Sequence, residues 1–293
     1  MDKPTIGFIG QGFIGKNMAN DIESRGYRVV RYALEEPYVR NRDAVATCDI
    51  VFIAVPTPTT PRGFDCSLLR RVLVHVGKGK IAVIKSTILP GTTESLQQAY
   101  PNITVLHSPE FLREKHAVED TVHPVRTIIG IPKKTKRYTD AAALVRSVLP
   151  ESPYTRIMMA REAELVKYGG HIFLTLKLVY MNTLHDIARS VGASYDVVAD
   201  AIGADPRIGP GHTNVVDSSG HRGAKKGRGA GGHCFPKDIA ALRHFYARTQ
   251  NTDREGVAFL KAVEAKNNKL LCDSGKDLDL IQDVYGAKVC QGR

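Results

Sequence analysis

The residues best suited to covalent chemistry lie in one glycine-rich turn. Cys234 lies in the segment Gly-Gly-His-Cys-Phe-Pro-Lys-Asp, residues 231–238. Glycines let a ligand approach the backbone closely, because no Cβ stands in the way. Lys237 and His233 can favour the thiolate form of the cysteine, and Asp238 can position a water molecule or a proton. The alternative interpretation is a tight turn that contains a buried structural cysteine.

A second motif is suited to binding phosphate. Gly10-Gln11-Gly12-Phe13-Ile14-Gly15 follows an apolar strand at residues 5–9 and opens a helix at residues 16–25, which is the context that a dinucleotide-binding βαβ unit requires. Gly10 permits the tight turn, Gly12 lets a pyrophosphate approach, and Gly15 lets the helix pack on the sheet. The helix N-terminus then stabilises the phosphate charge.

The end of the second strand does not settle which dinucleotide is bound. The position of the usual ribose-binding acid is occupied by Ala33, with Glu35 and Glu36 just after it and Arg31 just before. An arginine there can accommodate a 2′-phosphate, so both NAD and NADP remain open. Solvated loop charges are the alternative interpretation of these side chains.

The elements that position these motifs alternate in the first half of the chain. Short apolar strands separated by helices predict a doubly wound parallel sheet covered on both faces. The predicted strands lie at residues 5–9, 27–32, 49–55, 81–85, 104–106 and 127–131. The second half is mainly helical, with helices expected at residues 161–191, 195–202 and 238–249 and a long Gly-rich loop at residues 203–232. We therefore expect an α/β fold with a Rossmann-like domain at residues 1–150, a helical domain at 151–270 and a polar tail at 271–293.

Composition narrows the class of protein. Hydrophobic residues make up 43% of the 293 residues and charged residues 24%, which is ordinary for a globular chain with a sizeable core. A net charge of +11 fits an anionic ligand; because it is spread along the chain, we expect no nucleic-acid partner. No apolar run approaches a membrane span and no signal-peptide pattern is present, so we expect a cytoplasmic protein. The five scattered cysteines indicate neither a disulfide framework nor a metal site.

Taken together, the motifs resemble the UDP-glucose/GDP-mannose dehydrogenase family of nucleotide-sugar 6-dehydrogenases. The cysteine and Pro-Glu-Phe-Leu motifs are highly specific for the family, whereas the glycine fingerprint is not. The matching segments occur in the family's order: the glycine fingerprint, Val51-Phe52-Ile53-Ala54-Val55-Pro56-Thr57-Pro58, Lys85-Ser86-Thr87, Ser108-Pro109-Glu110-Phe111-Leu112-Arg113-Glu114, Ala163-Glu164-Leu165-Val166-Lys167-Tyr168, Asp205-Pro206-Arg207-Ile208-Gly209, and the cysteine motif.

The resemblance implies a two-step oxidation of a sugar C6 alcohol to a carboxylate, with one NAD reduced in each step. A covalent thiohemiacetal and thioester on Cys234 retain the reactive intermediates. Lys167 matches the cation that stabilises an oxyanion, Asp238 the residue that positions water, Glu114 the residue implicated in thioester hydrolysis, and Thr87 a member of the same water network. The resemblance assigns cofactor contacts to Gly10, Gly12, Phe13, Ile14, Gly15, Val55, Pro56, Thr57, Thr87 and Glu114. It assigns substrate contacts to Glu110, Phe111, Leu112, Lys167, His171, Arg207, Gly231 and Cys234.

Two departures from the family pattern bear on activity. His171 stands one helical turn after Lys167, where the family usually has asparagine, so catalysis can show a changed pH profile or be damaged. The chain ends 55 residues after Asp238, whereas full-length relatives continue with a second Rossmann-like domain that grips the substrate's nucleotide. We expect a short form, a fragment, or half of a two-chain system in which a separate chain completes the nucleotide site.

The leading hypothesis is an NAD-dependent nucleotide-sugar 6-dehydrogenase of polysaccharide biosynthesis, with UDP-glucose as its substrate. One alternative is a catalytically impaired remnant that binds NAD and a nucleotide sugar. Another is a simple hydroxyacid dehydrogenase, which would need no cysteine. We also expect a homodimer joined through the helix at residues 161–191. The basic segment at residues 221–228 either holds the substrate's pyrophosphate through Arg222, Lys225, Lys226 and Arg228 or is a solvated loop.

Overall fold

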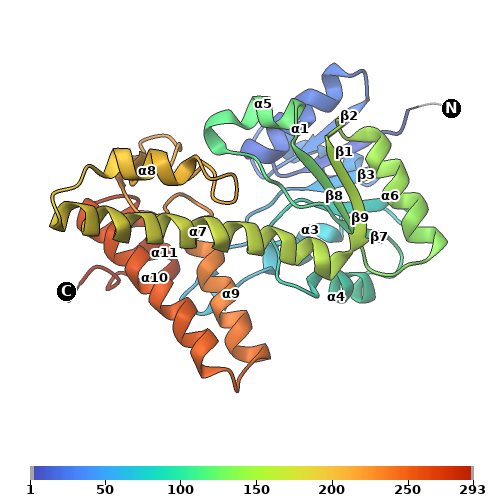
Figure 1. Cartoon of the computed structure of the whole chain (residues 1–293). Coiled ribbons are helices and arrows are strands. Elements are labelled where there is room, and N and C mark those ends of the chain that lie inside the picture. Colours follow the sequence, from blue (N-terminus) through green and yellow to red (C-terminus); the bar gives the residue numbers. More distant parts are fainter. Residues whose placement is uncertain (1–2, 292–293) are drawn as a thin grey trace. The chain divides into compact units, whose positions relative to one another are not determined.

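The computed structural model describes residues 3–291 and divides the chain into two compact units. The first unit extends to Lys167 but omits residues 58–64. The second unit contains residues 58–64 and the chain from Tyr168 onward. Helix α7 (Ala160–Ser190) begins in the first unit and continues as one helix into the second (Figure 1).

A seven-stranded sheet forms the centre of the first unit, in the order β2-β1-β3-β6-β7-β8-β9. The first five strands in this order run parallel, β8 is antiparallel to β7, and β9 is parallel to β8. The predicted α/β fold with a parallel sheet is therefore confirmed, except that the sheet is mostly rather than entirely parallel. Its strands are β1 (Ile6–Ile9), β2 (Val29–Tyr32), β3 (Ile50–Ile53), β6 (Ile81–Ile84), β7 (Thr104–His107), β8 (Arg126–Ile131) and β9 (Tyr154–Met159).

The central strands are buried because helices pack on the sheet. All residues of β1 and β3 are buried, and Phe8 stacks on Phe52 with ring centroids 5.2 Å apart. Met18 and Ile22 of α1 and Val145 of α6 join the same apolar cluster. The helices of this unit are α1 (Phe13–Ser24), η1 (Tyr38–Asn41), α2 (Arg42–Val45), α3 (Ser67–Leu73), α4 (Thr92–Ala99), η2 (Glu114–His116), α5 (Ala117–Val122) and α6 (Lys136–Val148).

Strand β9 was not predicted from the sequence. It lies at the edge of the sheet, and its side chains are exposed or half-buried. An edge strand needs no continuous apolar run, so β9 lacks the pattern that marked the other strands. The compact first unit extends to Lys167, past the domain boundary expected at residue 150.

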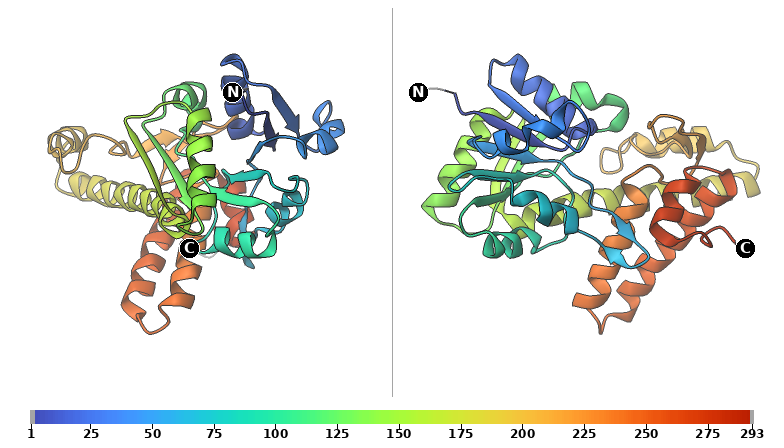
Figure 2. Two further views of the ribbon diagram at one scale, coloured as in Figure 1. Left: turned by 90° about the vertical axis from the view of Figure 1, so that its right-hand side faces the viewer. Right: turned by 180° about the vertical axis from the view of Figure 1, so that it is seen from behind.

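The second unit is mainly helical, and Figure 2 shows α9 and α10 as adjacent helices joined by a short turn. Residues 271–293, predicted to be a polar tail, include the end of α10 and all of α11, in which Ile281 and Val284 are buried. Besides the second part of α7, the unit contains β4 (Thr59–Thr60), β5 (Gly63–Phe64), α8 (Tyr195–Gly203), β10 (Val216–Ser218), β11 (Lys226–Arg228), α9 (Phe235–Thr249), α10 (Arg254–Ser274) and α11 (Leu278–Tyr285).

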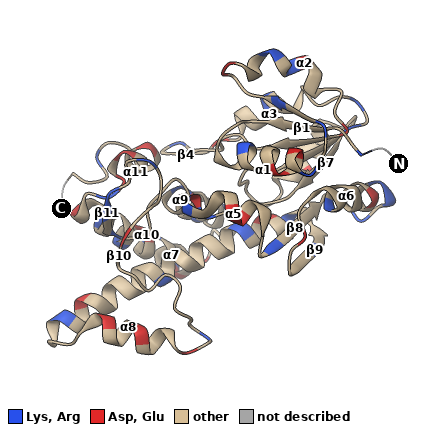
Figure 3. Ribbon diagram, turned by 90° about the horizontal axis from the view of Figure 1, so that it is seen from above, with Lys and Arg blue, Asp and Glu red and all other residues tan. Residues whose placement is uncertain are grey.

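One cysteine pair corrects the expectation from the sequence. Cys272 at the end of α10 and Cys290 form a disulfide, with their Cα atoms 5.6 Å apart. Their spacing of 18 residues gave no such indication, because the two approach each other only once α11 reverses the chain. In Figure 3 the ribbon positions of Lys and Arg residues occur on many elements of both units, as the dispersed charge of the sequence predicted.

Candidate functional site

The glycine turn after β1 has the geometry of a phosphate cradle. Gly10 has a φ of +94°, and a Cβ there would lie 2.3 Å from the carbonyl oxygen of Ala54. A Cβ on Gly15 would lie 2.0 Å from the carbonyl oxygen of Gly10. Gly12, by contrast, has no atom within 4 Å of its Cβ position, so its open side is the face that a ligand can approach. The geometry of the three glycines therefore fits the predicted roles: Gly10 in the tight turn, Gly12 beside the ligand and Gly15 in the close packing of the helix.

Helix α1 offers its N-terminus beside this open face. It begins at Phe13, directly after Gly12, and no acidic side chain lies in its first turn. The helix dipole therefore meets no opposing carboxylate where a pyrophosphate would sit. Phe13 is 39% exposed and Ile14 half-buried at this end. These residues fit a dinucleotide cofactor.

At the end of β2, Arg31 is held by α1. Its guanidinium donates to Asn20 Oδ1 at 2.7 Å and to Glu23 Oε2 at 2.6 Å. Ala33 is buried, whereas Leu34 is 78% exposed. Arg31 is thus already engaged within the protein, which favours a cofactor without a 2′-phosphate.

The carboxyl ends of the parallel strands lie level with one another. Val55 exchanges hydrogen bonds with the Ser86 hydroxyl, at 3.1 Å from the amide and 2.6 Å to the carbonyl. Thr57 Oγ1 donates to the carbonyl of Thr87 at 2.7 Å. Pro56 between them is exposed. Residues 55–57 and residues 86–87, which the resemblance places near the cofactor, are therefore hydrogen-bonded to each other. They lie at the carboxyl ends of the parallel strands, where the glycine turn also lies.

The predicted substrate segment contacts two buried lysines of the first unit. Lys85 forms an ion pair with the Glu110 carboxylate, and its ammonium also donates to Ser108 Oγ at 3.0 Å. Lys167, 6% exposed, donates to the carbonyl of Glu110 and lies 5.6 Å from the centre of the Phe111 ring. The predicted oxyanion-binding lysine and the predicted sugar-binding segment are thus brought together.

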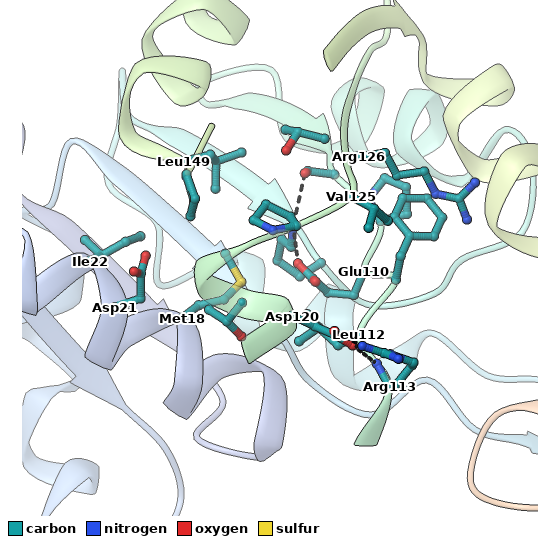
Figure 4. Close-up of a pocket in the computed structure, with 18 residues that line it drawn as sticks. Met18, Asp21, Ile22, Glu110, Leu112, Arg113, Asp120, Val125, Arg126 and Leu149 are labelled. Atoms are coloured by element: carbon teal, nitrogen blue, oxygen red, sulfur yellow. Dashed lines mark hydrogen bonds and ion pairs between the residues drawn. The ribbon is translucent and has the colours of Figure 1, made fainter. Parts of the chain in front are cut away.

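A cavity of about 280 Å³ lies beside this segment in the first unit (Figure 4). Leu112 lines it, and the guanidinium of Arg126 lies 3.8 Å from the centre of the Phe111 ring. Arg113 closes one side through its ion pair with Asp120 at 2.7 Å. Glu114, which follows, is half-buried at the start of η2.

His107, for which the sequence predicted no role, lies at the end of β7. It is fully buried, and its Nδ1 lies 3.0 Å from the carbonyl oxygen of Ile84. Burial lowers the pKa of His107 to about 3, although the Ile84 carbonyl acts in the opposite direction, and the nearby Lys85 and Lys167 lower it further. The ring is therefore neutral at physiological pH and adds no charge beside the two lysines.

Glu164 fastens α7 to the start of α4 within the first unit. Its carboxylate is fully buried and accepts hydrogen bonds from the amide of Gly91 at 2.6 Å and from the amide and hydroxyl of Thr93 at 2.9 and 2.6 Å. Burial raises the pKa of Glu164 to about 7, although these hydrogen bonds lower it. Glu164 lies one turn before Lys167 and so fixes the beginning of the helix that carries it.

The raised pKa of Glu164 predicts a pH-dependent stability. The unfolded chain releases this proton near 4.5 and the folded chain near 7. Between these values the folded state binds more protons, so stability falls as pH rises, by up to about 3 kcal/mol. Urea titrations at pH 5 and pH 8 should show this loss in the wild type and a smaller one in Glu164→Gln. The exposed-site control Glu119→Gln should behave as the wild type; an unchanged pH dependence in Glu164→Gln would contradict the assignment.

In the second unit, Cys234 lies at the N-cap of α9 and is half-buried. The amide of Asp238 donates to its carbonyl at 2.9 Å. Asp238 itself is fully buried between two cationic or titratable groups: Lys237 Nζ lies 2.5 Å from its Oδ1, and His171 Nδ1 lies 2.6 Å from its Oδ2. Burial alone would lower the pKa of Lys237, but the attraction of Asp238 and Cys234 outweighs it and raises this pKa. The lysine is therefore an ammonium beside the cysteine.

The His171 ring contributes geometry that asparagine could not. Its ring contacts Phe235 edge-on, with centroids 5.3 Å apart, while Nδ1 faces Asp238. A carboxylate at Nδ1 favours the tautomer in which Nδ1 carries the proton and Nε2 is the basic nitrogen. The arrangement can therefore accept or donate a proton at Nε2.

The remaining predicted substrate residues also belong to the second unit. Arg207 is 87% exposed in its side chain and pairs with Asp205 at 2.6 Å. Gly231 is buried in the turn before Cys234. Arg228, once a candidate for pyrophosphate binding, instead donates to Asn182 and Asp186 at 2.7 Å. Of the basic segment, Arg222, Lys225 and Lys226 remain exposed.

Within residues 3–291, no group of three or more His, Cys, Asp or Glu side chains could hold a metal ion. Likewise, none of the described helices is long and apolar enough to cross a membrane.

The glycine turn at the carboxyl end of β1, in a mostly parallel sheet, defines a dinucleotide-binding protein of the Rossmann type. A mainly helical unit follows, and it carries Cys234 together with Lys237, Asp238 and His171. Two family models match the chain. The NAD binding domain of the UDP-glucose/GDP-mannose dehydrogenase family matches residues 38–148, and the central domain of that family matches residues 161–269. The chain belongs to this family, as the motifs indicated.

Individual relatives agree with this assignment. A UDP-glucose 6-dehydrogenase of Rhizobium meliloti is 34% identical over 216 residues, which are 69% of this chain and 46% of the relative. A UDP-glucose dehydrogenase structure from Pyrobaculum islandicum is 28% identical, has a TM-score of 0.77, and covers 92% of this chain and 68% of its own. The chain spans about half the length of the curated relatives it matches.

The fold is also shared more widely. A 3-hydroxyisobutyrate dehydrogenase structure from Mycobacterium tuberculosis has a TM-score of 0.69 at 16% identity and covers 98% of each chain. At that identity the similarity concerns the fold alone.

Proposed function

We propose that the protein is an NAD-dependent nucleotide-sugar 6-dehydrogenase with UDP-glucose as its substrate. The observation that carries the proposal is Cys234 at the start of α9, beside an ammonium, Lys237, and the buried Asp238–His171 pair. A helix N-terminus and a neighbouring cation both favour a thiolate, which is the nucleophile that a two-step oxidation needs. The relatives' names supply the substrate class.

NAD, held at Gly10, Gly12, Phe13, Ile14 and Gly15 with Val55, Pro56 and Thr57, would supply the acceptor for the two hydrides that leave C6. In the first oxidation the C6 carbon loses a hydride and its hydroxyl group loses a proton, which leaves an aldehyde. Lys167 stabilises the negative charge that develops on the oxygen. Its contact with the Glu110 carbonyl places it beside the segment proposed to bind the sugar through Glu110, Phe111 and Leu112.

In the second oxidation the thiolate of Cys234 adds to the aldehyde carbon and gives a thiohemiacetal. Loss of a second hydride from that carbon, and of the hydroxyl proton, leaves a thioester. Water then attacks the thioester, the carbon–sulfur bond breaks, and the thiol and a uronate are released. Asp238, Glu114 and Thr87 are the residues proposed to position or activate that water.

His171 is proposed to take part in these proton transfers. Because Asp238 fixes its tautomer, the Nε2 nitrogen can receive a proton from water during thioester hydrolysis. The presence of His171 where the family usually has asparagine also favours the alternative function, in which an impaired protein binds NAD and a nucleotide sugar without turnover. The hydroxyacid dehydrogenase alternative gives no role to Cys234.

A hydride-production assay separates the three functions. The protein is incubated with NAD or NADP and a panel of UDP- and GDP-sugars, and the reduced cofactor formed is counted per sugar consumed. Two NADH per sugar with release of a uronate supports the proposal. Binding without turnover indicates the remnant, whereas one NADH from hydroxyacids alone indicates the third function. The engaged Arg31 leads us to expect a higher kcat/KM with NAD than with NADP.

The nucleotide of the substrate has candidate ligands in exposed basic residues of the second unit. Arg207, Arg222, Lys225 and Lys226 are exposed and can pair with a pyrophosphate. We further propose that the protein acts in the cytoplasm, in polysaccharide biosynthesis, and that a separate chain can complete the nucleotide site.

We predict a homodimer joined through α7. Phe173, Tyr180 and Ile187 recur every seven residues on this helix and are 63%, 59% and 53% exposed. Residues at this spacing share one helix face, and such an apolar stripe is typical of a helix–helix interface. Light scattering should give about twice the 32.1 kDa mass of one chain, and Tyr180→Asp should give the single-chain mass. A wild-type monomer at micromolar concentration would remove the prediction.

A further inference from the structure

The glycine turn that precedes Cys234 is held by residues near the C-terminal end of the second unit. Asn267 of α10 accepts from the amide of Ala230 at 2.7 Å and donates to its carbonyl at 2.9 Å. Lys276 Nζ donates to the carbonyl of Gly229 at 3.0 Å. These bonds fix the first half of the turn.

Asp277 fixes the second half. Its side chain is 1% exposed, and its Oδ2 accepts hydrogen bonds from the amide of Gly232 at 2.6 Å and from the Ser219 hydroxyl. Its Oδ1 lies 3.0 Å from His221 Nε2. One carboxylate therefore joins residues 219–221 to Gly232, which lies two residues before Cys234.

The charge state of this cluster agrees with an ion pair. Burial would raise the pKa of Asp277, but the hydrogen bonds from Ser219, His221 and Gly232 outweigh it and hold this pKa below its ordinary value. Both ring nitrogens of His221 face oxygen atoms, Nδ1 the carbonyl of Arg222 at 3.2 Å and Nε2 the Asp277 carboxylate. The doubly protonated ring satisfies both contacts, so the carboxylate meets a charged donor.

The glycines of the turn are shaped to this carboxylate. A Cβ on Gly231 would lie 2.1 Å from Asp277 Oδ2 and 2.8 Å from Ser219 Oγ. Gly232 has a φ of +75°, which other residues rarely adopt. Gly231 is thus required for Asp277 to approach the backbone, in addition to any contact with substrate.

We propose that Asp277 is a positioning residue for Cys234: by holding Gly232, Ser219 and His221 together, it keeps the thiol in place at the start of α9. Asp277 lies beyond residues 161–269, which the central-domain model of the family covers. The functional part of the inference rests on the proposed dehydrogenase activity.

The test compares Asp277→Asn with the exposed-site control Asp279→Asn. Loss of the charged hydrogen bonds should lower kcat by about tenfold, while KM for NAD remains unchanged. The first oxidation needs no thiol, so the NADH formed per UDP-glucose consumed should fall from two toward one, with aldehyde trapped by hydroxylamine. A general loss of folded protein would lower both oxidations equally and leave this ratio unchanged. Asp279→Asn should match the wild type.

A second measurement does not depend on the proposed reaction. Iodoacetamide labelling is followed by peptide mass mapping at Cys234, with half-buried Cys66 as the internal reference. We expect Asp277→Asn to slow labelling of Cys234 about tenfold relative to Cys66, because the thiol loses its fixed place beside Lys237. If wild-type protein makes no NADH from any nucleotide sugar, the proposed function fails and this measurement alone decides the positioning role.

The milder variant Ser219→Ala covers the case in which Asp277→Asn does not fold. It removes one donor to the carboxylate and should change both readouts in the same direction by a smaller factor. Unchanged labelling of Cys234 and an unchanged NADH ratio in a folded variant would overturn the proposal. A variant with a lowered melting temperature but unchanged Cys234 labelling and an unchanged NADH ratio would also overturn the proposal.

Discussion

Replacing Cys234 by alanine is expected to abolish uronate formation while leaving the first oxidation possible. Without the thiol no thioester forms, so the rate of uronate release should fall on the order of a thousandfold or more. Reduced cofactor should then appear at no more than one equivalent per sugar, and hydroxylamine should trap the aldehyde. Cys234→Ser is expected to accumulate a covalent ester, visible as added mass on the intact chain.

Cys66→Ala is the matched control, because Cys66 is a half-buried thiol of the first unit with no assigned role. It should retain the wild-type rate and two NADH per sugar. Uronate formation by Cys234→Ala at the wild-type rate would show that the covalent mechanism is wrong, although a dehydrogenase activity could remain.

Removing the carboxylate of Asp238 is expected to have the largest effect on stability. The side chain is fully buried and is the shared partner of Lys237 and His171. Asp238→Ala leaves a largely buried ammonium without this counter-ion, a change that typically costs about 3–5 kcal/mol. Urea denaturation should show this loss, and the thioester-hydrolysis step should slow because the tautomer of His171 is no longer fixed.

Asp200→Asn on α8 is the control, since Asp200 is exposed; it should change the unfolding free energy by less than about 0.5 kcal/mol. The double variant Asp238→Ala/Lys237→Met, which removes both charges, should recover part of the stability that Asp238→Ala loses. Equal stability of Asp238→Ala and the wild type would contradict the role of Asp238 as the buried counter-ion.

Local sequence patterns correctly predicted the strands in which successive residues are buried. The apolar strands β1, β3 and β6 and the glycine turn were found because each residue's environment follows from its immediate neighbours along the chain. Strand β9 was missed because its exposed side chains give no apolar run. The antiparallel β8 could not be anticipated, since strand direction depends on how the chain returns to the sheet.

The candidate site was predictable to the extent that it follows local motifs. Cys234, Asp238 and Lys237 are neighbours in sequence, whereas the pairing of Asp238 with His171 joins residues 67 positions apart. Lys85 and Glu164 lie within the matching motifs, but the sequence predicted no role for them, because their partners Glu110 and Thr93 come from other elements. Asp277 gave no signal at all: a single aspartate beside a lysine is ordinary until the fold brings Gly231 and Gly232 to it.

The attachment of Arg31 to α1 has a consequence for engineering. The guanidinium that could meet a 2′-phosphate is present at the end of β2 but is engaged by Asn20 and Glu23. Cofactor choice would then depend on two α1 side chains that need not touch the cofactor. Shortening them, as in Asn20→Ala/Glu23→Ala, would release a positive charge already placed at the right strand. This chain therefore offers a route to NADP use that leaves the glycine turn and the strand itself unaltered.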